Sequence, residues 1–71
     1  MDREMLAAQL RDADKALAEK HEQIEKQRAE IAELEANGHS TEIARAKLDN
    51  LQEALALYLL HRERLADELK K

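Results

Sequence analysis

Residues 37–41 read Asn-Gly-His-Ser-Thr and contain Gly38, the only glycine of the chain. No proline occurs on either side, and both flanking segments are rich in residues that favour helices. Glycine readily takes the left-handed conformation that commonly ends a helix. Ser40 is a good N-cap for a following helix, with Thr41 as the competing cap. The stretch therefore predicts a turn over residues 37–40, formed by Asn37, Gly38 and Ser40.

A long helix is expected on each side of this turn, from about residue 2 to 36 and from about 41 to 71. Ala, Glu, Lys, Leu and Arg make up 48 of the 71 residues, a composition typical of a coiled coil or a long helix. A short loop places two helices side by side and antiparallel. The predicted fold is all-α, one antiparallel two-helix coiled-coil hairpin over residues 1–71, with helices roughly 45–50 Å long.

Apolar residues at alternating spacings of three and four predict the seam between the helices. The expected hairpin core is Leu10, Leu17, Ile24, Ile31, Leu34, Leu48, Leu51, Leu65 and Leu69, with Leu6, Ala13, Ala44, Leu55 and Tyr58 continuing the same stripes. Polar residues interrupt the seam at Lys20, Gln27 and Arg62, whose stems can lie along the core while their polar ends reach water. Folding the chain about its turn places Lys20 near Tyr58 and Leu17 near Arg62.

The run from Leu55 to Leu60 does not fit an isolated hairpin, because its apolar residues cover every face of the helix. A hairpin buries only the side that faces its partner helix, so several leucines remain exposed, and such a patch indicates an interface. The predicted interface residues are Leu55, Leu57, Tyr58, Leu59 and Leu60. A homodimer that forms a four-helix bundle is favoured, because two-fold dimers are the commonest assemblies. The alternative is a different protein as the partner.

The histidines are the main candidates for chemistry. His21 and His61 lie on opposite helices and can approach each other across the hairpin, with Glu25 one turn from His21; two histidines and a carboxylate are a possible zinc set. The sequence lacks the His-Glu-x-x-His and Glu-x-x-His spacings of metal-binding helices. We interpret both histidines as boundary residues beside the seam and His39 as a turn residue, and we predict no metal site and no cofactor.

Other enzymatic signatures are also missing from the sequence. It has no cysteine and no glycine-rich phosphate loop. The hydroxyls of Ser40 and Thr41 are explained by helix capping. Most carboxylates alternate with basic residues, as on a solvated helix surface. We therefore expect a protein that is not an enzyme and has no catalytic residues.

Charge and hydropathy limit the classes of partner that the sequence favours. The formal net charge is −4, which does not attract a nucleic-acid backbone, and the only aromatic residue among Phe, Trp and Tyr is Tyr58, too few for a base-stacking platform. The longest apolar run has 7 residues, whereas a membrane-spanning helix needs about 20. The N-terminal residues do not form a secretory signal. We expect a cytoplasmic protein whose partners are proteins, and we expect it to bind neither a membrane nor nucleic acid.

The segment from Gln27 to Leu69 resembles a group of small alphaproteobacterial helical-hairpin proteins that have no assigned activity. Their pattern is Gln-Arg, Ile-x-x-Leu, Gly-His-Asp-Thr, Ala-x-x-Leu and a His/Arg-rich step before a final leucine. The matching residues here are Gln27, Arg28, Ile31, Leu34, Gly38, His39, Thr41, Ala46, Arg62 and Leu65. Ser40 replaces the more usual Asp, an exchange between two good N-caps. The resemblance covers about two-thirds of the chain and implies a bacterial origin.

The functional prediction is a protein–protein interaction or regulatory module that acts as a homodimeric helical bundle. The alternative is a small chaperone or inhibitor that masks a partner through the Leu55–Leu60 patch, like the helical-hairpin chaperones of type III secretion or a phage-type inhibitor. RNA binding by a hairpin dimer, as in the plasmid protein ROP, ranks lower, since the basic residues Arg45, Lys47, Arg62 and Arg64 are spread along the helix.

Overall fold

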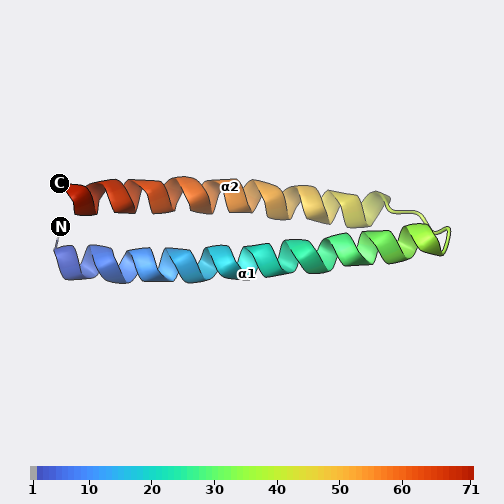
Figure 1. The fold of residues 1–71 in the computed structure, drawn as a ribbon. Helices are drawn as coiled ribbons and strands as arrows, with labels where there is room; N and C mark the ends of the chain where they lie inside the picture. Colours follow the sequence, from blue (N-terminus) through green and yellow to red (C-terminus); the bar gives the residue numbers. More distant parts are fainter. Residues whose placement is uncertain (1) are drawn as a thin grey trace.

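A computed structural model describes residues 2–71, which form two antiparallel helices joined by a short turn. Helix α1 spans Arg3–Ala36 and helix α2 spans Glu42–Lys70. They run side by side along their full lengths, and the start of α1 and the end of α2 lie together at the open end of the hairpin (Figure 1). The described part measures 53 × 14 × 13 Å along its principal axes. The predicted helical hairpin is confirmed.

The turn owes its shape to Gly38, whose φ of +70° lies in the left-handed region. The amide of His39 donates to the carbonyl of Leu34 at 2.9 Å, and the amide of Gly38 donates to the carbonyl of Glu35 at 3.1 Å. These two hydrogen bonds form a Schellman motif, which satisfies carbonyls that the end of α1 leaves without helical partners. Asn37 is the C-cap residue of α1.

The start of α2 differs by one residue from the predicted position. Helix α2 begins at Glu42, and Thr41, rather than Ser40, is its N-cap residue. The Thr41 side chain makes no capping hydrogen bond; its Oγ1 accepts from Nε of Arg45 at 2.9 Å. The Ser40 hydroxyl accepts from the amide of Glu42 at 3.5 Å. The Thr41 hydroxyl therefore bonds to Arg45, whereas the Ser40 hydroxyl bonds to the first amide of α2, that of Glu42.

At the other end of the hairpin, the N-cap of α1 is Asp2. Its Oδ1 accepts from the amide of Glu4 at 3.3 Å. An acidic side chain at this position also complements the positive end of the helix dipole.

The core follows the predicted seam. All nine predicted core residues are buried or half-buried. The buried side chains of the described residues are Leu6, Ala13, Leu17, Ile24 and Ile31 on α1 and Ala44 and Leu65 on α2. Leu6, Ala13 and Leu65 form one cluster near the open end, with Leu10 and Leu69 packed against it. Full burial of a Leu or Ile side chain contributes about 1.5–3 kcal/mol, so this seam is the main stabilising feature of the hairpin.

Polar residues of the seam reach partners on the opposite helix. Nε2 of Gln27 donates to the carbonyl of Ala44 at 3.0 Å, and Nε of Arg62 donates to Asp14. Lys20 lies near Tyr58, as predicted, with its ammonium 5.9 Å from the ring centre. Asp14 lies about one turn before Leu17, the residue that the sequence predicted to lie near Arg62. No buried side-chain nitrogen or oxygen within residues 2–71 lacks a hydrogen-bond partner.

Candidate functional site

The exposed leucines of α2 are the first part of the candidate site. The exposed fractions are 66% for Leu57, 42% for Leu59, 45% for Leu60 and 38% for Tyr58. We call these four residues the apolar surface of α2. Leu55, the fifth predicted interface residue, is half-buried and belongs to the seam with α1.

Two hollows border this surface, one lined by α2 alone and one lined by both helices. One, of about 380 Å³, is lined by Ala54, Leu57, Tyr58 and His61. The other, of about 290 Å³, is lined by Gln9, Asp12, Ala13, Ala16, Tyr58 and His61. Tyr58 and His61 line both hollows, so we treat the two as one feature, the Tyr58–His61 groove. Both hollows are open to solvent, and each has room for protruding side chains of a neighbouring molecule.

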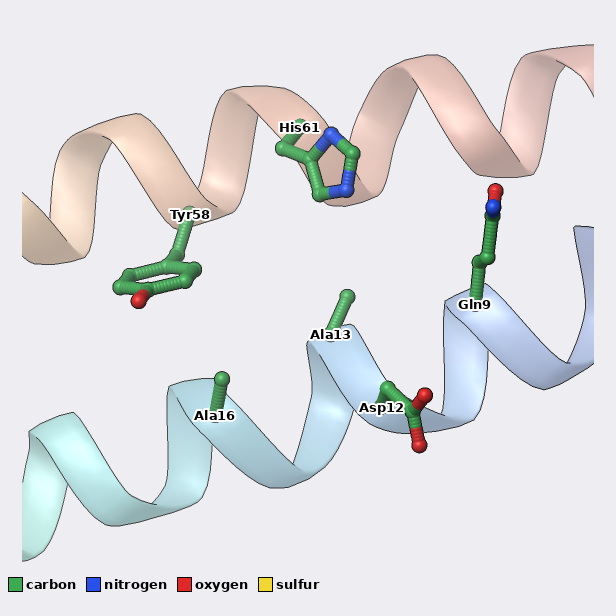
Figure 2. A pocket seen from close by; sticks show the side chains of 6 residues that line it. All are labelled: Gln9, Asp12, Ala13, Ala16, Tyr58 and His61. Atoms are coloured by element: carbon green, nitrogen blue, oxygen red, sulfur yellow. The ribbon is translucent and has the colours of Figure 1, made fainter.

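Small residues make the groove possible. Figure 2 shows Tyr58 and His61 projecting from α2 toward α1, with Ala16 across from Tyr58 and Ala13 across from His61. Alanine at both positions leaves space above α1 that a larger side chain would fill. Gln9 rises from α1 at one end of the groove, while Asp12 points away from α2 (Figure 2). The groove therefore has an apolar floor and a polar rim on the α1 side.

Lys20 contacts Tyr58, one of the two residues that line both hollows. Its ammonium lies over the Tyr58 ring, an arrangement in which the ring face attracts the positive charge. The same ammonium donates to Oε1 of Gln23 at 3.3 Å. These contacts hold the Lys20 side chain along the seam and its charge at the edge of the apolar surface.

Of the two histidines considered as a pair, only His61 lines the groove. His61 faces Ala13 across the groove (Figure 2). His21 is exposed and is absent from the residues that line either hollow. Within residues 2–71, no group of three or more His, Cys, Asp or Glu side chains is placed to hold a metal ion. The third histidine, His39, donates its amide to the Schellman motif of the turn.

Sequence reasoning found the leucines but missed the groove beside them. Gln9, Asp12 and Ala16 were not expected to take part in a site, because they lie on the flank of α1 rather than in its seam. A signal existed on α2, where Ala54, Leu57, Tyr58 and His61 follow the spacing of one helix face. Which residues of α1 lie opposite this face depends on the rotation of each helix about its own axis. The composition of the chain does not reveal that rotation.

The chemistry of this site suits contact with another macromolecular surface. Leu57 and Tyr58 offer apolar area, and Gln9, Asp12 and His61 offer hydrogen-bonding groups at the rim. Neither helix of the described chain has an apolar stretch long enough to cross a membrane. Comparison of the chain with models of protein families, with curated proteins and with solved structures finds no match. The resemblance to alphaproteobacterial hairpin proteins accordingly stays a prediction.

Proposed function

We propose that this chain is a non-enzymatic interaction module that works as a homodimeric helical bundle. The observation that carries the proposal is the exposure of Leu57 and Leu60, which lie three residues apart and therefore on neighbouring parts of the α2 surface. Each of these side chains gains on the order of 1.5–3 kcal/mol when it is fully buried. A contiguous apolar patch of this kind marks an interaction site more often than chance exposure.

A second copy of the hairpin is the partner that we favour. Small single-core chains commonly gain stability by oligomerising, and two hairpins stacked face to face make a four-helix bundle. The groove beside Tyr58 lies between the two helices on one broad face of the hairpin, where such stacking takes place. Burial of Leu57 and Tyr58 against a second copy would remove most of the apolar area on that face from water.

A heterologous partner is the second candidate, and the position of Leu59 favours it. Leu57 and Leu59 are two residues apart and project about 160° from each other around the helix. One flat neighbour therefore covers only one of them. A dimer built over the groove leaves Leu59 on the opposite flank of each hairpin, where it can contact a different protein that the module masks or regulates.

The test is absolute mass by light scattering over a dilution series of untagged protein. We expect a mass twice the 8.2 kDa of one chain. Leu57→Glu is expected to give the mass of one chain, because dimerisation would bury an unpaired charge. The matched control is Ile43→Glu, at a residue of the same helix that is 77% exposed and lies outside the apolar surface.

Three results would count against the proposal. They are a native protein that stays monomeric at every concentration, a Leu57→Glu variant that stays dimeric, and equal dissociation by Ile43→Glu. Circular dichroism at each concentration verifies that both variants retain the helical hairpin, as their exposed positions predict.

A further inference from the structure

We propose a specific arrangement for the second copy: it packs antiparallel over the Tyr58–His61 groove, with α2 against α2 and α1 against α1. The two-fold axis runs across the hairpin, through Ala16 and the step between Leu57 and Tyr58. This inference rests on the proposed self-association and adds its register and the residues that meet.

The groove wall on α2 is symmetric in sequence, which supports an antiparallel pairing of two α2 helices. Its four lining residues are Ala54, Leu57, Tyr58 and His61, so the outer two each lie three residues from the central pair. In an antiparallel pair of α2 helices centred on that step, Ala54 of one copy faces His61 of the other. Leu57 faces Tyr58 in the same way. Each imidazole then lies over an alanine, and small-against-large contact of this kind lets two surfaces interdigitate.

Opposite charges at the two ends of the α2 interface support the same register. One heptad before Ala54 on the same face stands Lys47, and one heptad after His61 stands Glu68. The proposed register places Lys47 of each copy opposite Glu68 of the other, so an ion pair closes the interface at both ends. Both residues are exposed. Among residues 2–71, Lys47 makes no ion pair, and the one ion pair of Glu68 is with Lys71, three residues later, at 3.2 Å.

Neighbouring registers are less favourable. Sliding one copy by one helical turn in one direction brings Lys47 opposite Arg64, which places like charges together. Sliding it in the other direction brings Leu57 opposite Arg62, which leaves a charged group against the most exposed leucine of the patch. The antiparallel register centred on Leu57 and Tyr58 avoids both conflicts.

The residues of α1 on either side of this axis are also complementary. Ala16 lies across the groove from Tyr58 (Figure 2), so the same axis passes through Ala16. About this centre, Asp12 of one copy faces Lys20 of the other, four residues on either side. Gln9 faces Gln23 in the next layer, seven residues on either side. An alanine at the centre permits close approach of the two α1 helices, and the opposite charges flank it.

Cysteine cross-linking tests this register directly, since the chain has no cysteine of its own. The double variant Ala54→Cys/His61→Cys cannot bridge within one chain, because seven residues of helix separate its Cα atoms by about 10 Å and disulfides need less than about 7 Å. With oxidised glutathione as the oxidant, we expect covalent dimers to form roughly a hundredfold faster than from either single variant, since the facing thiols have an effective concentration near millimolar. Ala56→Cys, on another face of α2, is the control and should remain unlinked.

Each outcome of this experiment discriminates between arrangements. Fast linkage of the single variants Ala54→Cys and His61→Cys would indicate parallel α2 helices and overturn the proposal. A native protein that is dimeric by light scattering, with a double variant that links no faster than Ala56→Cys, would overturn the register and leave the proposed function standing. A monomeric native protein would overturn both.

Charge reversal gives a second measurement that does not depend on cysteine. Lys47→Glu and Glu68→Lys should each raise the dimer dissociation constant severalfold, because each creates two like-charge contacts per dimer. The combined variant should return the constant to within about twofold of the native value, because the pairs are restored in reversed order. A combined variant that dimerises as weakly as the sum of its parts would overturn the register.

Discussion

Helix α1 buries most of its large apolar side chains, whereas α2 leaves several of its own exposed to solvent. Five residues of α1 are buried, from Leu6 to Ile31, but on α2 only Ala44 and Leu65 are buried while Leu57 is two-thirds exposed. The apolar residues of α1 follow one stripe with spacings of three and four, and one partner helix is enough to cover a stripe. The run Ala54–Leu60 surrounds α2, so one partner helix leaves part of it in water. The hairpin is therefore stabilised mainly at the seam, and the proposed interface lies on the outside of α2.

The largest effect should come from truncating a buried residue of α1 and comparing it with an exposed leucine of α2. Ile24 is 4% exposed, and Ile24→Ala should lower the free energy of unfolding by about 2–5 kcal/mol through lost burial and a cavity. Leu57→Ala should cost the isolated hairpin about 0.5 kcal/mol or less. Urea unfolding followed by circular dichroism measures both values.

Chain concentration separates the two roles. The loss caused by Ile24→Ala should persist at every concentration, whereas that of Leu57→Ala should grow as the native protein associates. Ile43→Ala, at an exposed residue of α2 outside the apolar surface, should lose little at any concentration. Equal, concentration-independent losses for Ile24→Ala and Leu57→Ala would remove the distinction between a stabilising seam and a binding surface.

The seam was predictable from the sequence because its signal is repeated. Leu10, Leu17, Ile24 and Ile31 recur every seven residues, and each is buried or half-buried as expected. The single glycine indicated the position of the turn for a similar reason, since glycine takes positive φ with the least strain of any residue. The partition of capping between Ser40 and Thr41 was not predictable, because it depends on the position of the Arg45 side chain.

The next largest effect concerns the turn that sets α1 against α2. Gly38→Ala should lower the free energy of unfolding by about 1–2 kcal/mol, the usual strain of an L-residue in the left-handed conformation. A Cβ at Gly38 would meet no atom within 4 Å, so the strain arises from the backbone alone. Gly38→Asn is the control and should lose less, because asparagine tolerates this conformation. Equal losses, measured by urea unfolding, would point to something other than backbone strain.

A smaller effect should follow from Gln27, the α1 residue that donates to the α2 backbone at Ala44. Gln27→Ala removes this hydrogen bond, and we expect a loss of about 0.5–1.5 kcal/mol. The control is Gln52→Ala, at an exposed residue of α2, where the same change should be nearly neutral. If both variants unfold at the same urea concentration, the contact between Gln27 and Ala44 does not help to fix α2 against α1.

The groove was harder to predict than the seam, and the reason is physical. The residues of α1 that line it are Gln9, Asp12, Ala13 and Ala16, and only Ala13 belongs to the seam. Which flank residues meet those of α2 depends on the axial register of the helices. Counting residues from the turn placed Lys20 near Tyr58, as observed, but it did not predict the ion pair of Arg62 with Asp14, because a long side chain can reach residues on the flank of the opposite helix.

The smallest effect should come from that ion pair. The side chains of Asp14 and Arg62 are 52% and 41% exposed, so Asp14→Asn should cost only about 0.2–1 kcal/mol. The loss should shrink in concentrated salt, which screens exposed charges. Glu22→Gln removes a pair with Lys26 that lies entirely within α1, and it serves as the matched control for losing one carboxylate charge. Urea unfolding at low and high salt compares the two variants. A larger loss for Asp14→Asn would mean that the pair helps to hold α2 against α1, whereas equal losses would leave the apolar seam as the sole link that matters between the helices at this end.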